Sequence, residues 1–381
     1  MIGFLDDRAV AQRVLDHVRD ATTDRGEKVW REPVANYTSD DRFAQEISVL
    51  RRSPTPFCPS AALAEPGAHV ARVAAGTPIL AVRGDDGRVR AFRNACRHRG
   101  MPLAAGAGCA RAFVCRYHGW TYRLDGSLRH VPHEDGFPGL DKDEHGLTPV
   151  LAWEHAGIVF VQQDGAPIAD PAPWEGLPEA ISACDELLET REGAVEVNWK
   201  VFLEGFLEGY HIRPAHRDTF YPYGYDNLNV VECSGRNSRV TFPFRRIEKL
   251  ADVPASRRSI DGCVTYVYHL FPNALVTVLS RHTNLVVIEP IDVGRSRLVT
   301  WAMARTNGDP AVLEEAKRDA SFVNETGAAE DLEIVLAIQR SIRSRANEYF
   351  TFGQFEKAIV HFHENLHAAL RGPADEPPPG R

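Results

Sequence analysis

The sequence predicts an α+β protein in which a small all-β domain precedes a larger domain with an antiparallel sheet wrapped by helices. Three observations support this fold class. Short β-leaning runs separated by turn residues occupy residues 46–165, and consecutive strand-like stretches fill residues 229–303. Helical periodicity appears at residues 8–22 and again after residue 311.

The composition is that of a globular protein. The chain has 381 residues, of which 44% are hydrophobic and 25% charged, and a net charge of −8, so two domains with substantial cores are expected. The acidic balance provides no basic surface for nucleic acid or for an anionic membrane. Charged residues near the N-terminus and the lack of a long apolar run predict a cytoplasmic protein. Seven scattered cysteines fit reduced thiols better than a disulfide framework.

Residues 1–45 predict an N-terminal helical arm that packs on the larger domain, because apolar residues recur at helical spacing within 8–22. Residues 46–168 form the predicted all-β domain. A Gly-Asp-Asp-Gly sequence at 84–87 predicts a hairpin turn within it. Its strand signals are His69–Val73, Ile79–Val82, Val89–Phe92, Phe113–Cys115, Trp120–Tyr122 and Ile158–Val161.

A stretch rich in Pro, Gly and Asp from Asp164 to Pro178 predicts the linker to the second domain, which spans residues 169–371. The last ten positions, 372–381, are rich in proline, and this composition predicts a disordered tail.

Helices and strands are both expected in the second domain. Residues 196–211 predict one amphipathic helix that Pro214 terminates. Further helices are predicted over 311–344 and 354–371. Between the first helix and these later helices lie six strand signals, Asn229–Cys233, Arg239–Phe242, Val264–Leu270, Leu275–Leu279, Thr283–Ile288 and Leu298–Met303.

Two Cys-His pairs stand in the all-β domain. Cys96-Arg-His98 and Cys115-Arg-Tyr-His118 each offer one thiolate and one imidazole within a short loop. Two Cys and two His also satisfy a structural zinc, but zinc fingers usually pair Cys with Cys and His with His. One ligand of each kind per loop fits a Rieske [2Fe–2S] cluster, in which two thiolates hold one iron and two imidazoles the other.

These loops resemble those of Rieske-type non-haem iron oxygenases, the aromatic-ring-hydroxylating dioxygenase family, down to the flanking Arg99-Gly100 and Gly119-Trp120. Gly100 and Gly119 suit tight turns where the backbone approaches a cluster. The resemblance extends over residues 40–370. It implies the alpha, or terminal oxygenase, subunit, with a Rieske domain followed by a catalytic domain that binds mononuclear Fe(II).

A second metal site is expected in the catalytic domain. His211 and His216 cannot share one face of a continuous helix, but a break at Pro214 lets them converge. A lone pair of histidines is more often structural, whereas a redox cluster in the same chain favours a non-haem iron held by two His and one carboxylate. The resemblance implies Asp331 as the third ligand. Alternatively, the acids around Asp331 serve only the helix N-terminus.

Glu208 lies three residues before His211, on the same face of the predicted helix. By resemblance, this acid links a mononuclear-site histidine to a cluster histidine, matching His118, of a neighbouring subunit, and a homotrimer is implied. Glutamate at this place, together with the closing segment Phe355–His363, resembles the branch that acts on choline, carnitine and glycine betaine. Glu204-Gly205 departs from the Glu-Asn that family members often have, so any contact made by that Asn is absent here.

The resemblance implies an oxidoreductase that activates O2 and hydroxylates a small organic substrate, either aromatic or quaternary ammonium, by mono- or dihydroxylation or oxidative demethylation. No flavin or nicotinamide fingerprint is visible, so electrons are expected from NAD(P)H through a separate reductase or ferredoxin. The alternative function is a Rieske electron-transfer protein without oxygenase activity. Aromatic residues that fit either a substrate pocket or plain core are Phe202, Phe206, Tyr210, Tyr221 and Phe271.

Residues His363-Glu364-Asn-Leu-His367 match the zinc-peptidase pattern His-Glu-x-x-His. On a helix this spacing places both imidazoles on one face. Because few residues follow, no downstream segment is expected to supply a third ligand. The apolar spacing predicts a packed amphipathic helix instead.

Overall fold

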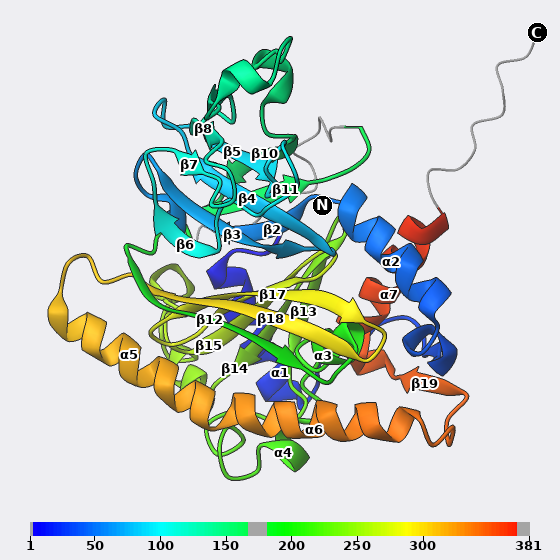
Figure 1. Cartoon of the computed structure of the whole chain (residues 1–381). Coiled ribbons are helices and arrows are strands. Elements are labelled where there is room, and N and C mark those ends of the chain that lie inside the picture. The colour runs from blue at the N-terminus through cyan, green and yellow to red at the C-terminus, as the bar shows by residue number, and fades with distance from the viewer. Residues whose placement is uncertain (1–2, 167–180, 372–381) are drawn as a thin grey trace, which may run out of the picture.

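The computed structural model describes residues 3–166 and 181–371, and Figure 1 shows an upper β domain stacked on a larger lower body. The α+β layout is confirmed. Most of the predicted linker from Asp164 to Pro178, and the predicted tail at 372–381, lie outside the described residues. Among the residues described, no helix combines the length and apolar character that a membrane crossing requires.

The upper domain is built on a seven-stranded antiparallel sheet with the order β2-β11-β10-β5-β4-β3-β6. The predicted hairpin at 84–87 joins β4 and β5, where the Gly84 N–H donates to the Arg88 carbonyl. A three-stranded sheet, β7-β8-β9, carries the second Cys-His loop. The strands are β2 (Thr55–Pro59), β3 (Ala68–Ala74), β4 (Thr77–Arg83), β5 (Val89–Arg93), β6 (Gly106–Cys109), β7 (Phe113–Val114), β8 (Thr121–Tyr122), β9 (Leu128–His130), β10 (Pro149–His155) and β11 (Ile158–Gln162).

The lower body is built on a second seven-stranded antiparallel sheet with the order β12-β18-β17-β16-β15-β14-β13. All six predicted strands of this domain are present, and β12 is an additional strand that was not predicted. That strand lies at the sheet edge and is largely exposed, so it lacks the alternation that marks a half-buried strand. The strands are β12 (Glu186–Val195), β13 (Val230–Ser234), β14 (Asn237–Pro243), β15 (Val264–Leu270), β16 (Ala274–Val278), β17 (Thr283–Asp292) and β18 (Arg295–Ala304).

Helices cover this second sheet. In Figure 1, α5 and α6 run end to end across its lower side, while α2 and α7 lie together at one end. The helical region predicted over 311–344 consists of two helices, which break at Thr326. The helices are α1 (Asp7–Asp20), α2 (Asp40–Arg52), α3 (Trp199–Glu204), α4 (Ile212–Ala215), α5 (Pro310–Glu325), α6 (Gly327–Ile342) and α7 (Lys357–Arg371).

Smaller elements tie distant parts of the chain together. A two-stranded sheet pairs β1 (Trp30–Pro33) with β19 (Tyr349–Phe352), so an N-terminal segment lies beside the segment that leads into α7. Helix α2 crosses the domain boundary predicted at residue 45. The 3₁₀ turns are η1 (Val34–Tyr37), η2 (Ser60–Leu63), η3 (Glu134–Gly136), η4 (Asp143–His145), η6 (Arg245–Leu250), η7 (Ala255–Arg257) and η8 (Gln354–Glu356).

A buried ion pair joins the two domains of the chain. Arg72 of β3 places its Nη1 2.5 Å from Oε1 of Glu289 on β17, and both side chains are almost fully buried. The other Glu289 oxygen accepts from the Ala75 N–H at 2.8 Å. One hydrophobic cluster also contains residues of both domains, such as Ile79 and Val276. The two domains therefore share a core.

Candidate functional site

The two Cys-His loops have the same backbone design. The Cys96 N–H donates to the Met101 carbonyl, and the Cys115 N–H donates to the Trp120 carbonyl in the equivalent place. Gly100 and Gly119 follow with φ values of 76° and 74°, a region that favours glycine, as the sequence predicted. Each loop is therefore a tight turn that presents its cysteine and histidine side by side.

The four side chains sort into a thiol pair and an imidazole pair. Cys96 and Cys115 are both buried, and their thiols interact with each other. The rings of His98 and His118 lie 4.5 Å apart between centroids. Nδ1 of His98 is buried without a hydrogen-bond partner among the described residues. A buried nitrogen of this kind is unfavourable unless a ligand occupies its lone pair, so this donor set fits a cluster with thiolate and imidazole ligands.

Aromatic residues support this cluster site. Trp120 stacks on the His98 ring with centroids 5.0 Å apart and an angle of 10°. The Tyr122 hydroxyl lies 3.3 Å from the Cys96 sulfur and accepts from the Arg97 N–H. His118 is exposed, whereas His98 is half-buried. The His118 edge of the site therefore faces outward.

The second predicted site forms around α4 in the lower body. His211 caps the N-terminus of this four-residue helix, and His216 caps its C-terminus. The single turn brings their rings to 5.2 Å between centroids. Oδ1 of Asp331, on α6, lies 3.0 Å from Nε2 of His216 and 3.6 Å from Nε2 of His211. The structure thus brings the three predicted side chains together in an arrangement that could hold a metal ion.

The predicted helix over 196–211 is wrong in its extent, because α3 ends at Glu204. Glu208 accepts hydrogen bonds from the backbone N–H groups of Tyr210 and His211, so its side chain replaces helical carbonyls. At Gly209 a Cβ would lie 2.2 Å from Oδ1 of Asn229, so a larger residue there would displace the Asn229 side chain. Pro214 does not end a helix either, since it lies inside α4. Glu208 and His211 therefore meet through a turn rather than along a helix face.

Two carboxylates orient the histidine rings. Glu208 bonds to Nδ1 of His211, and Glu330 lies 2.7 Å from Nδ1 of His216. In both rings the Nε2 atom is thereby directed toward Asp331. Paired carboxylates of this kind fix the tautomer and orientation of metal-binding histidines. The role of Glu330 was missed, although its position beside Asp331 was visible in the sequence.

A glycine lets α6 approach the site. Phe220 packs on the His216 ring with centroids 5.0 Å apart. A Cβ at Gly327 would lie 2.0 Å from the Phe220 ring, so a larger residue there would displace the start of α6. The glycine therefore allows Glu330 and Asp331 to reach His216.

The electrostatics of this site favour added positive charge. Burial lowers the pKa of His211, but Glu208 and Asp331 outweigh it, and the pKa lies above its usual value. The pKa of His216 is raised in the same way, against burial, by Asp331 and Glu330. A surplus of carboxylates around two imidazoles suits a divalent cation.

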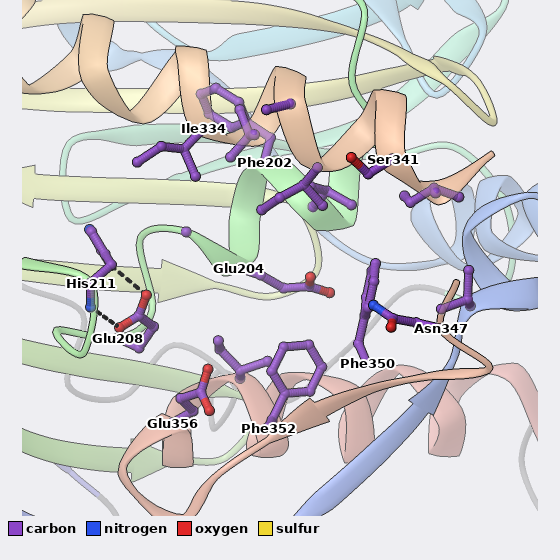
Figure 2. Close-up of a pocket in the computed structure, with 18 of the residues that line it drawn as sticks. Phe202, Glu204, Glu208, His211, Ile334, Ser341, Asn347, Phe350, Phe352 and Glu356 are labelled. Carbon is purple, nitrogen blue, oxygen red and sulfur yellow. Dashed lines mark hydrogen bonds and ion pairs between the residues drawn. The ribbon is translucent and has the colours of Figure 1, made fainter. Parts of the chain in front are cut away.

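A pocket of about 660 Å³ opens beside His211 and Asp331. Figure 2 shows the Glu204 and Glu356 carboxylates entering it among phenylalanine rings. Burial, and then the nearby Glu208 and Glu204, raise the pKa of Glu356 to about 7. The remaining walls of the pocket are aliphatic side chains of α3, α6 and α7 and small polar groups. The phenylalanines that line it are Phe202, Phe206, Phe350 and Phe352.

The aromatic candidates from the sequence have different outcomes. Phe202 and Phe206 line the pocket. Tyr210 is exposed and packs on Phe355, and Phe271 is buried in the core. Tyr221 lies outside the lining residues and is contacted by Arg213 and Arg245. Phe350 and Phe352 were missed because they lie on β19, which pairs with a strand more than 300 residues earlier.

Two family models match the chain. The Rieske [2Fe-2S] domain matches residues 53–150, and the catalytic domain of ring hydroxylating alpha subunits matches residues 184–372. The carnitine monooxygenase oxygenase subunit of Escherichia coli K12 is 27% identical over 367 residues, covering 89% of this chain and 94% of that protein. Chloroplastic choline monooxygenase of Arabidopsis thaliana is 25% identical over 319 residues, covering 77% of this chain and 71% of that protein.

Solved structures share the fold. The quaternary ammonium Rieske monooxygenase CntA in complex with L-carnitine superposes with a TM-score of 0.75 at 24% identity, covering 90% of this chain and 95% of that chain. Naphthalene 1,2-dioxygenase with bound indole superposes with a TM-score of 0.72 at 18% identity, covering 89% of this chain and 92% of that chain.

A Rieske domain joined to a domain that binds mononuclear iron defines an iron-dependent terminal oxygenase. The chain belongs to the Rieske-type non-haem iron oxygenases and is an alpha subunit of that family. Like other members, it takes electrons from a reductase or ferredoxin and binds a small-molecule substrate. The match to the catalytic domain favours the oxygenase over the pure electron carrier, and the match to the Rieske domain favours the [2Fe–2S] cluster over zinc.

Proposed function

We propose that this oxygenase hydroxylates a small choline-like cation, a quaternary or methylated amine without a carboxylate of its own. The observation that carries the proposal is the charge of the pocket. Its lining includes Glu204, Glu208, Asp331 and Glu356, and no Lys or Arg stands among the lining residues that the structure describes.

This lining suits a soft organic cation. Phenylalanine faces attract ammonium groups through the ring quadrupole, and nearby carboxylates add direct attraction. Glu356 is the acid best placed for this role, because burial and the nearby Glu208 and Glu204 raise its pKa more than the Gly353 N–H and His211 lower it. A neutral aromatic ring beside Glu356 would desolvate this carboxylate without adding an opposite charge, which is costly.

Relatives act on substrates of this class, since their names specify carnitine and choline. Carnitine carries a carboxylate that needs a basic partner, and the described lining residues include no Lys or Arg, while His211 is already paired with Glu208 and Asp331. Choline has a neutral hydroxyl arm instead. The pocket therefore favours the choline-like cation over the carnitine-like zwitterion.

We infer the metal ligands from the donor sets. Cys96, His98, Cys115 and His118 hold the cluster, and His211, His216 and Asp331 hold the mononuclear iron. When bound, the cluster supplies single electrons and the iron makes dioxygen reactive toward the substrate. The protein supplies orientation: Glu208 and Glu330 hold the two imidazoles so that each presents Nε2.

The substrate change balances with two electrons and two protons. One oxygen atom enters a C–H bond next to the nitrogen, and the other leaves as water. Hydroxylation at such a carbon yields a carbinolamine, which breaks its C–N bond to release an aldehyde and the smaller amine.

We also propose that electrons pass between subunits of a homotrimer. His118 is exposed, and its ring contacts within the described chain are with His98 and Tyr117. Glu208 contacts Tyr210 and His211 of its own chain. Electrons would pass from the exposed His118 of one subunit to the partly exposed Glu208 of the next. Glu208 then leads to His211 at the iron site.

The test is oxygen uptake with NADH and a reductase or ferredoxin, across matched substrates. Choline and its neutral isostere 3,3-dimethylbutan-1-ol differ only in the charged nitrogen, and carnitine and naphthalene complete the panel. We expect choline-like amines to drive uptake with stoichiometric aldehyde release, and the isostere to be turned over at least tenfold less efficiently. Equal turnover of the isostere, or preference for naphthalene, would overturn the proposal.

A further inference from the structure

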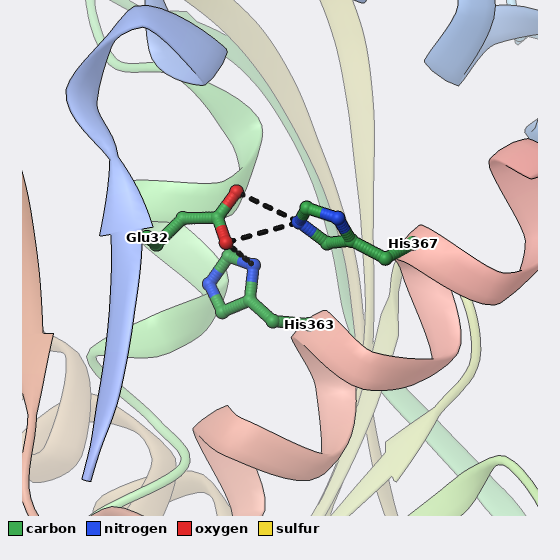
Figure 3. Close-up of side chains that lie close together, drawn as sticks. All are labelled: Glu32, His363 and His367. Carbon is green, nitrogen blue, oxygen red and sulfur yellow. Dashed lines mark hydrogen bonds and ion pairs between the residues drawn. The ribbon is translucent and has the colours of Figure 1, made fainter.

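A second group of metal-binding side chains lies away from the iron site. Figure 3 shows Glu32 of β1 facing His363 and His367 of α7. The two histidines are the pair in the His-Glu-x-x-His pattern. The sequence expectation concerned downstream segments only, whereas this carboxylate comes from a strand near the N-terminus. None of the three side chains lines the substrate pocket.

The spacing of the three donors is close to that of a metal site. Oε2 of Glu32 lies 3.0 Å from Nε2 of His367 and 3.6 Å from Nδ1 of His363. Two ligands of a tetrahedral zinc lie about 3.3 Å apart, given bonds of about 2.0–2.1 Å. Both measured separations bracket that value, and all three donor atoms lie within 4.8 Å of one another.

The hydrogen bonding leaves one nitrogen unexplained. Nε2 of His363 lies 2.9 Å from Oε1 of Glu204, which fits donation of the ring N–H to that carboxylate. Nδ1 then carries a lone pair, and it is fully buried without a hydrogen-bond partner among the described residues. In the neutral ring this lone pair faces a carboxylate oxygen of Glu32 at 3.6 Å, which is repulsive unless positive charge lies between them, either a metal ion or a proton on Nδ1.

Surrounding groups hold the donors in place. Trp30 Nε1 and Asn36 Nδ2 donate to the Glu32 carboxylate at 2.9 and 2.6 Å. Tyr37 donates to the same Glu204 oxygen that contacts His363. A carboxylate on the far nitrogen of a histidine is a recurring feature of zinc sites, because it fixes the ring and increases its basicity.

We propose that Glu32, His363 and His367 bind a structural zinc ion. Two imidazoles and a carboxylate suit zinc, and His367 is partly exposed, so water completes the fourth position. The ion neutralises the fully buried Glu32 carboxylate and fastens β1 to α7. Since Phe352 stacks on His363 and lines the substrate pocket, this fastening supports the pocket wall from behind.

The arrangement differs from that of a peptidase. The acid between the two histidines, Glu364, is exposed and forms an ion pair with Lys28 at 2.6 Å, so it does not face the three donors. His363 offers Nδ1 rather than Nε2 to the site, because Nε2 is engaged by Glu204. The site is accordingly structural.

The direct test is metal content after expression without a polyhistidine tag and dialysis against buffer containing zinc and then none. Plasma mass spectrometry should find about one zinc per chain in the wild type and less than a tenth of that in His367→Ala. His361→Ala is the matched control, since His361 lies on α7 and bonds to Asn365 instead. It should keep its zinc.

Two further measurements do not depend on the variants folding equally well. Anomalous diffraction on either side of the zinc edge should place a peak between Glu32, His363 and His367 in wild-type crystals. Added zinc should raise the Tm by about 3 °C or more in the wild type and in His361→Ala but not in His367→Ala. Wild-type protein without stoichiometric zinc, or with iron at this position, would overturn the proposal. Neither measurement depends on the proposed substrate, on the Rieske cluster or on the mononuclear iron.

Discussion

Nδ1 of His216 lies 2.7 Å from Oε2 of Glu330, so that the next residue on α6, Asp331, meets the opposite nitrogen of the same ring. Two adjacent carboxylates thus bracket one imidazole. Glu330 sets the orientation of the ring, and the Asp331 carboxylate lies beside Nε2 at the proposed iron position.

Replacing Glu330 by Ala should weaken iron binding about 10- to 100-fold while leaving the Rieske cluster intact, because the ring loses its orienting partner. Titration of the iron-depleted protein with ferrous ion measures this change, and the visible spectrum reports the cluster. Glu333→Ala changes an exposed acid on the same helix and serves as the control. Equal iron affinity in both variants would show that Glu330 has no orienting role.

Replacing Glu208 by Gln should retain both metals but slow electron transfer between them by at least about 100-fold, because one carboxylate oxygen becomes an NH2 donor that cannot accept an imidazole N–H. Stopped-flow reoxidation of the reduced cluster with oxygen and substrate follows this step. The conservative variant Glu208→Asp should recover part of the rate. Wild-type reoxidation in Glu208→Gln would argue that electrons reach the iron by another route.

Glu356→Gln should raise KM for a choline-like cation about tenfold, equivalent to ~1.4 kcal/mol, with little change in kcat. The variant keeps the size of the side chain and removes the charge that faces the pocket. Steady-state oxygen uptake separates the two constants. Glu364→Gln, an exposed acid of α7 outside the pocket, should behave as wild type. An unchanged KM in Glu356→Gln would mean that the cation is held elsewhere.

His269 should make the protein sensitive to acid. Burial lowers its pKa to about 4, below the 6.5 of an exposed histidine, against a small opposing effect of the Pro272 carbonyl. Below pH 6.5 the unfolded chain takes up a proton that the folded chain refuses, so the free energy of unfolding falls as the pH drops toward 4. The loss attributable to this residue is about 3 kcal/mol across that window.

Denaturant unfolding at several pH values between 7 and 4 measures this contribution. His269→Gln keeps a donor for the Pro272 carbonyl and does not titrate, so its stability should depend less on pH. His155→Gln, at an exposed site, should retain the wild-type slope. Parallel slopes in all three proteins would exclude His269 as the source.

Local patterns in the sequence were sufficient for much of the fold. Strand-like stretches between turn signals predicted β13 to β18, and the two Cys-His loops specified their own turns through Gly100 and Gly119. Both features depend on neighbours within a few residues. Helix α3 was overestimated because the apolar spacing continues past Glu204, whereas the Glu208 side chain bonds to the backbone that a helix would have used.

Contacts between distant segments were beyond such patterns. Glu32 reaches His363 and His367 because β1 pairs with β19, and nothing near Glu32 in the sequence signals that pairing. The position of Glu330 beside Asp331 is visible in the sequence. Which of the two acids meets which nitrogen of His216 depends on how α6 approaches that ring. The pairing of strands and the approach of helices thus decide which predicted residues become a site.

The iron and acid-labile sulfide content of the wild type and of His216→Ala tests the central claim most directly. Two cooperating centres predict about three iron atoms and two sulfides per wild-type chain, and about two of each in the variant. The variant should also keep the visible spectrum of the cluster and lose substrate-dependent oxygen uptake. A variant that retains the third iron and turns over normally would contradict the assignment of the oxygen-activating site.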